Sequence, residues 1–379
     1  MPPATEPIDT DSLVVDYRLT ISARESARSK ARAIAREQTV EIPEKVADPA
    51  VEERMIGRVV RVRKLSARHA EASIAYPWRE LVSDLPQLLN LLFGNISMQR
   101  GIRLERVRWP EALVARFPGP RFGVRGLRDR LGVADRPLLA TSLKPVGLSP
   151  AELGRLAAEC VLGGIDVLKD DHSLADQPAA PFRERVFAIA EAVRAANRAS
   201  GRRSIYVPNL TGTIEGLSER VEDLKEAGVG AAMIAPLLVG FDTVRWLAES
   251  SDLLLVGHSA FSGAYLGRSH GLAPSLLWGD LFRLAGCDVV VYPNAGGRFP
   301  ISSRDCREVQ ERLLGPLGEM AASLAMVGGG IDAARLARYR ASYSADTIFL
   351  VGGALYRGGR MRERATELRE LLSARTERG

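Results

Sequence analysis

The sequence has few cysteines and no long apolar run. Its three cysteines, Cys160, Cys287 and Cys306, are odd in number and far apart. This pattern does not suit a disulfide framework, so we expect reduced thiols with structural roles. No apolar run approaches the roughly 20 residues needed to cross a bilayer. The segment 1–11 is acidic and lacks the apolar stretch of a signal peptide. We therefore expect a cytoplasmic protein without a membrane partner.

The basic residues are not gathered into one tract. The net charge of +6 and a sequence pI of about 9.4 raise the question of nucleic acid, but the arginines are scattered along amphipathic stretches. Scattered arginines argue against a nucleic-acid footprint. Hydrophobic residues make up 46% and charged residues 26%, which is the balance of an ordinary globular protein. We expect a mildly basic enzyme for anionic small molecules.

What the chain does have, from Pro137 onward, is a repeated rhythm of a short apolar run, a turn and an amphipathic stretch. Eight such units predict a parallel sheet, and their number and spacing favour a closed (β/α)8 barrel. An open doubly wound sheet is the alternative, but the first turn lacks the glycine pattern of that fold. The predicted strands are Leu138–Pro145, Asp166–Asp171, Ile205–Thr211, Ala231–Pro236, Leu253–Ser259, Asp288–Asn294, Ala322–Gly328 and Thr347–Gly353. The predicted helices between and after them include Ser149–Leu162, Phe182–Ala199, Ile214–Ala227, Ser303–Leu313 and Arg360–Ser373.

The region before Pro137 differs in kind. Leu13–Ile21 and Gly57–Lys64 alternate like exposed strands, whereas Arg24–Gln38 and Leu85–Phe93 have helical spacing. This pattern predicts a smaller α+β domain, of ferredoxin-like type, joined to the barrel through a Pro/Gly/Arg-rich segment at 117–132. We place the domains at residues 1–128 and 129–379.

Polar residues gather at the predicted carboxyl ends of the strands, which is where barrels of this class hold their active sites. Lys169, Asp171 and His172 lie together after the second strand, beside a further carboxylate, Asp170. Such a cluster is either a solvated charged loop or a site for a hard metal ion, which prefers oxygen ligands. A free lysine ammonium would oppose the metal unless the lysine is modified. The other strand-end residues are Lys144, Asn209, His258 and Asn294.

Two groups of glycines end the last two strands. They are Gly328, Gly329 and Gly330, followed by Gly352 and Gly353. Glycines can simply satisfy tight turns, but backbone amides without Cβ atoms also form anion-binding concavities at this end of a barrel. Two groups on adjacent strands favour a phosphate site.

These residues resemble the large subunit of ribulose-bisphosphate carboxylase (RuBisCO) and its non-carboxylating RuBisCO-like relatives. The resemblance extends over nearly the whole chain. Its most specific segment is G-G-I-D-V-L-K-D-D-H at 163–172, followed by Gln177-Pro178 and Phe182-Arg183-Glu184-Arg185. Supporting segments are Leu143-Lys144-Pro145 before Gly147-Leu148-Ser149, then Ala75-Tyr76-Pro77, Phe93-Gly94-Asn95 and Glu37.

The resemblance implies roles for these residues. Lys169 resembles the lysine that CO2 converts to a carbamate, which binds Mg²⁺ together with Asp171. Lys144 resembles the lysine that moves protons on and off the enediolate, and His258 matches a histidine of the pocket. Gly330, Gly352 and Gly353 match one phosphate site. Glu37 and Asn95 resemble the residues that one subunit lends to its partner's active site, which implies a homodimer or an assembly of dimers. The full set of predicted catalytic, metal and substrate residues is Lys144, Lys169, Asp171, His172, His258, Glu37, Asn95, Asn209, Asn294, Arg298, Gly328, Gly329, Gly330, Gly352 and Gly353.

Departures from the family pattern argue against carboxylation. His172 stands where the family has a glutamate ligand, so it is either a metal ligand or an acid-base group. The sixth loop reads P-N-A-G-G-R-F at 293–299 and lacks the lysine that steadies CO2. Ser259 and Gly328 replace an arginine and a serine of the second phosphate site. One phosphate site therefore survives.

The K-D-D-H variant at 169–172, together with the pattern of the sixth loop, resembles the group that acts on acid sugars. That resemblance implies a Mg²⁺-dependent carbon-carbon lyase or hydrolase, a decarboxylase or transcarboxylase/hydrolase of 3-oxo-isoapionate 4-phosphate, working through an enediolate. The first alternative is a RuBisCO-like enolase or isomerase of the methionine-salvage type. The second is a barrel that has lost catalysis and serves as a binding protein.

Overall fold

The computed structural model describes residues 11–373, and the chain divides into two units. The first comprises residues up to 117 together with 261–281 and 316–320, and the second comprises the rest. Among residues 11–373, no helix combines the length and apolar character that a membrane crossing requires.

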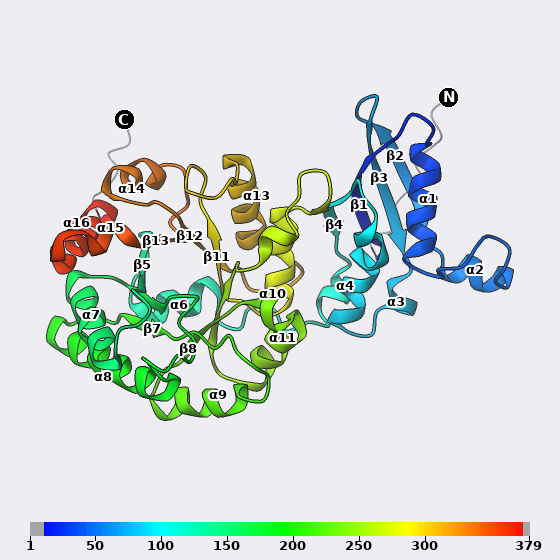
Figure 1. Ribbon diagram of the computed structural model, residues 1–379. Helices are drawn as coiled ribbons and strands as arrows, with labels where there is room; N and C mark the ends of the chain where they lie inside the picture. The colour runs from blue at the N-terminus through cyan, green and yellow to red at the C-terminus, as the bar shows by residue number, and fades with distance from the viewer. Residues whose placement is uncertain (1–10, 374–379) are drawn as a thin grey trace. The chain divides into compact units, whose positions relative to one another are not determined.

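The first unit is built on a sheet with the strand order β10-β4-β1-β3-β2. Strands β1 to β4 are labelled in Figure 1. Strands β1 to β4 with α1 and α4 follow a β-α-β-β-α-β order, and antiparallel pairing places β1 between β3 and β4. This is the ferredoxin-like arrangement that the sequence predicts. Strand β10 adds parallel to β4 at the sheet's edge. The elements of this unit are β1 Leu13–Thr20, α1 Ala27–Glu37, α2 Pro49–Met55, β2 Arg58–Lys64, β3 His69–Tyr76, α3 Trp78–Leu81, α4 Leu85–Phe93, η1 Asn95–Met98, β4 Ile102–Arg108, α5 Glu111–Val114, β10 Gly271–Leu272, η2 Ser262–Ala264 and η3 Ser275–Leu281.

The second unit is an eight-stranded parallel barrel. Its strands follow chain order around the sheet, and the isolated parallel bridge between Asn209 and Met233 joins β7 to β8. The predicted (β/α)8 fold is therefore confirmed. The strands are β5 Leu138–Leu143, β6 Val167–Asp170, β7 Ile205–Val207, β8 Ala231–Ile234, β9 Leu254–His258, β11 Val289–Pro293, β12 Leu324–Gly328 and β13 Thr347–Val351. The helices are α6 Gly123–Leu131, α7 Pro150–Gly163, α8 Phe182–Ser200, α9 Leu217–Glu226, α10 Pro236–Val239, α11 Phe241–Ser250, α12 Phe282–Leu284, α13 Ser303–Leu314, α14 Ala333–Arg340, α15 Gly353–Tyr356, η4 Arg357–Gly359 and α16 Met361–Ser373.

Local sequence accounts for where these elements begin and end. Helix α7 starts with a capping box, in which the Ser149 side chain accepts a hydrogen bond from the backbone of Glu152 and the Glu152 carboxylate bonds the backbone of Ser149. It ends at Gly164, which has a left-handed φ of 94°. The chain therefore turns sharply into β6, whose carboxyl end carries the lysine and aspartates of the predicted site.

The predicted linker at 117–132 contains a helix, α6, and this is a difference from the sequence-based expectation. Leu127 and Leu131 of α6 are buried in the barrel core. The backbone N–H groups of Phe122 and Gly123 donate to the Asp288 carboxylate, and Asp288 immediately precedes β11. Helix α6 thus covers the amino ends of the strands. The arginines that made this stretch look like a linker flank a narrow apolar face, so periodicity over one short helix was too weak a signal.

Candidate active site

The carboxyl ends of β5, β6 and β9 bring five predicted residues together. Lys144 Nζ lies 2.5 Å from Asp171 Oδ2, and His172 Nδ1 lies 3.3 Å from Asp171 Oδ1. The rings of His172 and His258 are stacked, with their centroids 4.9 Å apart and an interplanar angle of 6°. Burial and the charge of Lys169 both lower the pKa of His258, so Lys169 belongs to the same cluster. One carboxylate, two lysines and two imidazoles therefore share this site.

Lys169 is buried, with 1% of its surface exposed. Its Nζ donates to the backbone carbonyl of Asp170 at 2.8 Å. Burial lowers its pKa from 10.5 to about 8, against the opposing effect of Asp171 and Asp170. The neutral form of this amine is therefore more populated near physiological pH than that of an exposed lysine, although the protonated form still predominates. A neutral amine is the form that reacts with CO2, and the structure thus removes one barrier to carbamate formation.

Asp170 has a structural role. Arg185 Nε lies 3.2 Å from Asp170 Oδ2, and the Tyr206 hydroxyl donates to Oδ1 at 2.8 Å. The backbone N–H of Asn209 also donates to Asp170 Oδ2, at 3.0 Å. Because its oxygens are already bonded inside the barrel, Asp170 is not available to a ligand. Of the two adjacent aspartates, only Asp171 faces the reactive cluster.

Hydrogen bonds favour different tautomers for the two histidines. The backbone N–H of Ala260 donates to His258 Nδ1 at 3.1 Å, so the proton of the neutral His258 ring lies on Nε2. The Asp171 carboxylate beside His172 Nδ1 favours a proton on Nδ1, which leaves Nε2 of His172 as an acceptor. Burial lowers the pKa of both rings, and the neighbouring lysines lower it further. Neutral rings can therefore offer one proton acceptor and one proton donor.

Asn209 and Asn294 differ in whether their side-chain amide groups have hydrogen-bond partners. The Asn209 side chain donates to the backbone carbonyl of His172 at 3.0 Å and accepts from the backbone N–H of Thr211 at 3.0 Å. Both of its polar groups are used, which suits a residue that holds the His172 loop in place. Asn294 accepts from the Tyr343 hydroxyl at 2.6 Å, but its buried Nδ2 has no hydrogen-bond partner among the described residues. Asn294 therefore keeps a donor for a substrate oxygen.

The glycines lie on adjacent strands, as predicted. Gly329 and Gly330 have left-handed φ values of 111° and 68°, which side chains rarely adopt. Gly352 and Gly353 are different, because a Cβ at either position would meet nothing within 4 Å. Packing and backbone strain therefore do not require glycine at 352 and 353. Open space beside these backbone amides is what an anion site needs.

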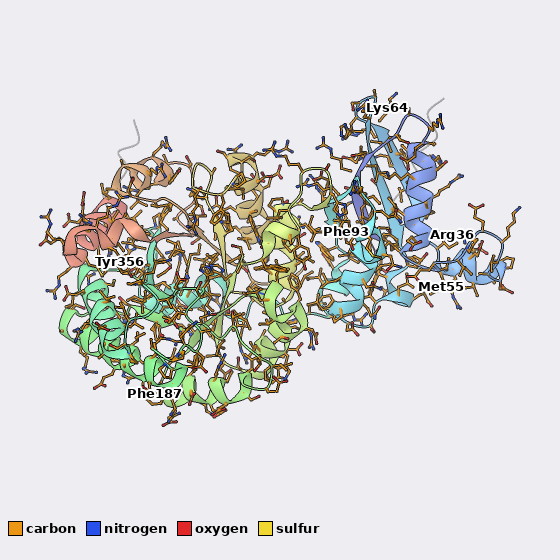
Figure 2. The ribbon with its side chains drawn as sticks, in the orientation of Figure 1. Arg36, Met55, Lys64, Phe93, Phe187 and Tyr356 are labelled. Carbon is orange, nitrogen blue, oxygen red and sulfur yellow. The ribbon has the colours of Figure 1, made fainter. Side chains whose placement is uncertain are left out.

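Tyr356 is a residue that the sequence analysis missed. It ends α15 (labelled in Figure 2). Its hydroxyl donates to the carbonyl of Ser142 at 2.6 Å and accepts from the backbone N–H of Lys144 at 3.1 Å. Tyr356 thus ties the helix that begins at Gly353 to the strand end that carries Lys144. A tyrosine five residues after the eighth strand gives no sequence signal for such a link.

The other predicted side chains, Arg298, Glu37 and Asn95, do not belong to the cluster around Asp171. In the barrel unit, Arg298 is exposed on the loop after β11, its guanidinium 4.8 Å from the Phe299 ring centroid, and its charge contributes to lowering the pKa of His172. In the first unit, Asn95 Nδ2 donates to Glu37 Oε1 at 3.2 Å. Glu37 and Asn95 are therefore brought together by the end of α1 and the start of η1.

The donors around Lys169 restrict how a divalent cation could bind. Among residues 11–373, no group of three or more His, Cys, Asp or Glu side chains is placed to hold a metal ion. Asp171 supplies the one carboxylate of the cluster, and Mg²⁺ prefers several oxygen ligands. The residues fit Mg²⁺ if Lys169 is carbamylated, because the carbamate adds oxygen ligands beside Asp171.

Comparisons with known proteins agree on the family. Residues 4–113 match the ribulose bisphosphate carboxylase large chain N-terminal domain, and residues 123–299 match its catalytic domain. The chain is 39% identical to a 5-methylthioribulose-1-phosphate isomerase of Rhodospirillum rubrum, over 94% of each chain. It is 32% identical to a 2,3-diketo-5-methylthiopentyl-1-phosphate enolase of Geobacillus kaustophilus, over 76% of this chain and 71% of the relative. A crystal structure of a RuBisCO-like protein from Rhodopseudomonas palustris superposes with a TM-score of 0.88 at 35% identity, covering 97% of this chain and 99% of that one.

These relatives overturn the predicted substrate. The expectation of a 3-oxo-isoapionate 4-phosphate decarboxylase or transcarboxylase/hydrolase is wrong, since the similar named enzymes are an isomerase and an enolase of methylthio sugar phosphates. The alternative given by the sequence analysis agrees better. The physical reason is that both chemistries need the same enolising groups, so strand-end residues alone do not distinguish them. Fold, domain matches and full-length relatives together place this chain in the ribulose bisphosphate carboxylase large-chain family, among its non-carboxylating RuBisCO-like members.

Proposed function

We propose that this protein is an isomerase of 5-methylthioribulose 1-phosphate or a close methylthio-pentulose phosphate. The proposed reaction removes the proton from the hydroxyl-bearing carbon next to the carbonyl and returns a proton to the former carbonyl carbon. The former carbonyl oxygen gains a proton and the neighbouring hydroxyl loses one, so the carbonyl moves to the neighbouring carbon. The observation that carries the proposal is the stacked pair His172 and His258, which offers an acceptor and a donor above a single carboxylate. The full-length similarity to the Rhodospirillum rubrum isomerase supports the same reaction class.

In this proposal, His172 is the general base. Its Nε2 removes the proton from the carbon beside the carbonyl, while Asp171 at Nδ1 holds the ring and stabilises the imidazolium that forms. The same ring can return the proton to the neighbouring carbon. Because its pKa lies below 6.5, His172 is mostly neutral at physiological pH and is ready to accept the proton.

His258 and Lys144 act on the oxygen side of the reaction. His258 donates from Nε2 to the carbonyl oxygen as negative charge develops there. Lys144 lies on the other oxygen of Asp171 and is 41% exposed, so its ammonium can turn from Asp171 to a substrate oxygen. This double role makes Lys144 a carrier of protons and of compensating charge.

In this proposal, the substrate phosphate and the Mg²⁺ ion bind at separate sites. The phosphate would lie against the backbone amides of Gly330, Gly352 and Gly353, with Asn294 Nδ2 as an additional donor. Mg²⁺ with a carbamylated lysine is general in this family, and here a carbamylated Lys169 and Asp171 would hold it. When bound, Mg²⁺ would polarise the substrate carbonyl as a Lewis acid.

A twofold dimer is part of the proposal. Glu37 and Asn95 are bonded to one another and are placed for a joint role. By resemblance to the family, that role is to complete the active site of the partner protomer. Mixing two inactive variants, Asn95→Ala and Lys169→Met, should then restore activity, because a mixed dimer contains one site with neither change. Each variant alone is the control, and a mixture no more active than its components would contradict shared sites.

The experiment for the reaction uses 5-methylthioribulose 1-phosphate with Mg²⁺ and bicarbonate. Proton and phosphorus NMR would follow the substrate and any isomeric methylthio-pentulose phosphate. We expect an isomer of unchanged mass and no released CO2. Parallel incubation with 2,3-diketo-5-methylthiopentyl 1-phosphate tests the enolase reaction. Turnover of the diketone alone would replace the isomerase proposal with the enolase, and inertness toward both would refute proton transfer on methylthio sugars.

A further inference from the structure

The amino ends of the barrel strands carry a group of arginines that the proposed chemistry does not use. Arg136 precedes β5 and Arg202 precedes β7. Arg369 lies on α16, which packs against α7 (Figure 1). The catalytic cluster lies at the opposite ends of these strands. The arginines therefore form a separate feature, called here the basal arginine cluster: Arg136, Arg202 and Arg369.

The cluster has more positive charge than its carboxylate can balance. Arg136 contacts both oxygens of Asp166, at 2.6 and 2.7 Å. The backbone N–H of Leu139 also donates to Asp166, at 2.8 Å. Arg136 thus neutralises Asp166, and no carboxylate among residues 11–373 lies within ion-pair distance of Arg202 or Arg369. Asp166 also attracts the charge of Arg369, so three guanidinium groups share this one carboxylate and the cluster keeps an excess of two positive charges.

Arg202 and Arg369 share one small space over the turn between α7 and β6. A Cβ placed on Gly164 would lie 3.2 Å from Arg202 Nη1 and 3.1 Å from Arg369 Cγ. The Nε atoms of both arginines are buried and have no hydrogen-bond partner among the described residues. Burial lowers the pKa of Arg369, and the charges of Arg136 and Arg202 lower it further, against the opposing effect of Asp166. Buried donors without partners and crowded like charges both cost free energy that an anion would recover.

We propose that Arg202 and Arg369, with Arg136 beside them, form a binding site for a phosphate-class oxyanion at the amino end of the barrel. Two uncompensated guanidinium groups match the charge of a phosphate dianion, and their forked donors match its tetrahedral oxygens. A ligand that carries a single carboxylate group would balance only one of these two positive charges. This site is independent of the proposed isomerase reaction.

The bound anion would join α16 to the barrel. Helix α16 already contacts the turn at Gly163, where a Cβ would lie 2.5 Å from the Ala365 side chain and 2.7 Å from the Arg362 carbonyl. Asp166 follows this turn and begins the segment that leads to Lys169. An anion held by Arg202 and Arg369 would therefore stabilise the packing of α16 on the strand that carries the catalytic lysine. It would act as a structural ligand, not as a substrate.

Thermal unfolding with inorganic phosphate tests the proposal, with chloride at equal ionic strength as the reference. The variants are Arg202→Gln and Arg369→Gln, and the matched control is Arg360→Gln, whose side chain is 70% exposed. Gly353→Asp removes the contribution of the catalytic phosphate site. We expect the phosphate-dependent rise in Tm to persist in Arg360→Gln and in Gly353→Asp. In the two cluster variants it should shrink, with phosphate affinity lower by about tenfold or more.

The opposite pattern would overturn the proposal. If Gly353→Asp abolishes the phosphate effect while Arg202→Gln and Arg369→Gln retain it, phosphate binds the catalytic end alone. Ribose 5-phosphate in place of inorganic phosphate distinguishes a free anion from the phosphate group of a metabolite. Wild-type crystals soaked in selenate provide a measurement that needs no variant. An anomalous peak between the Arg202 and Arg369 guanidinium groups is expected, and its absence at a concentration that fills the catalytic site would contradict the site.

Discussion

Replacing Lys169 with methionine should stabilise the protein near neutral pH while abolishing its activity. Methionine fills a similar volume and carries no charge into the buried position. The pKa of Lys169 falls from 10.5 to about 8 because burial penalises the ammonium. At 1.36 kcal/mol per pKa unit, this shift of about 2.5 units corresponds to a destabilisation of about 3 kcal/mol when the lysine is charged. The hydrogen bond that Nζ donates to Asp170 reduces the net gain on substitution by about 1 kcal/mol.

The sign of the pH dependence follows from linkage. Below pH 8 the lysine is protonated in both the folded and unfolded states, so the full penalty is present. Between pH 8 and 10.5 the folded protein loses the proton first, and the penalty fades as the pH rises. The stabilisation by Lys169→Met should therefore be greatest at pH 7 and small at pH 10.

The assay is urea unfolding of both proteins at pH 7 and pH 10 in buffers free of CO2 and Mg²⁺. Lys225→Met is the control, because the Lys225 side chain is 78% exposed. The control should differ little from the wild type at either pH. If Lys169→Met is less stable than the wild type at pH 7, the neighbouring aspartates compensate the ammonium fully. The argument that burial prepares this lysine for carbamylation would then be refuted.

The other predictions concern the remaining parts of the site. His172→Gln should lower kcat by about 100-fold or more with little change in KM, since a general base contributes about that factor. Burial holds the pKa of His172 below its ordinary value, so kcat/KM of the wild type should fall with acidity at a midpoint below that of an ordinary histidine; a midpoint above that of an ordinary histidine would contradict this base. Tyr356→Phe should lower the free energy of unfolding by about 1–3 kcal/mol, because the Ser142 carbonyl and the Lys144 N–H each lose a hydrogen bond. An unchanged midpoint of urea unfolding would show that Tyr356 does not stabilise the contact between α15 and the end of β5. Gly353→Asp should leave the melting temperature without phosphate unchanged, since a Cβ there meets nothing within 4 Å, yet raise KM by about tenfold or more through repulsion of the substrate phosphate; an unaltered KM would move the phosphate elsewhere.

Much of the barrel could be predicted because its strands are short, apolar and buried on both faces. Each predicted strand contains the observed one, and four of them, β5, β7, β8 and β13, begin at the predicted residues. The gathering of Lys144, Lys169 and His258 followed from topology, since parallel strands end on the same face. Tertiary contacts between distant segments could not be read in this way. The bonds of Asp170 to Arg185 and Tyr206, and of Tyr356 to Lys144, depend on side-chain directions that a linear pattern does not encode.

The substrate was beyond the reach of the same reasoning. In the proposed reaction, Lys169 and His172 would act on a proton next to a carbonyl, whichever sugar carries that carbonyl. Binding selectivity commonly lies in loops, and no periodicity predicts the backbone conformation of a loop such as 293–299. Similarity to an acid-sugar group therefore led to the wrong substrate, although the segment 163–172 indicated the right family.

The most direct test of the proposed proton transfer is solvent exchange during turnover. 5-Methylthioribulose 1-phosphate would be incubated in D2O with the wild type and with His172→Gln, and deuterium at carbon would be followed by NMR. We predict that the wild type places deuterium on a carbon next to the carbonyl and forms an isomer, while His172→Gln does neither at a comparable rate. Isomer formation or deuterium exchange by His172→Gln at a rate equal to that of the wild type would contradict the central role of the histidine pair.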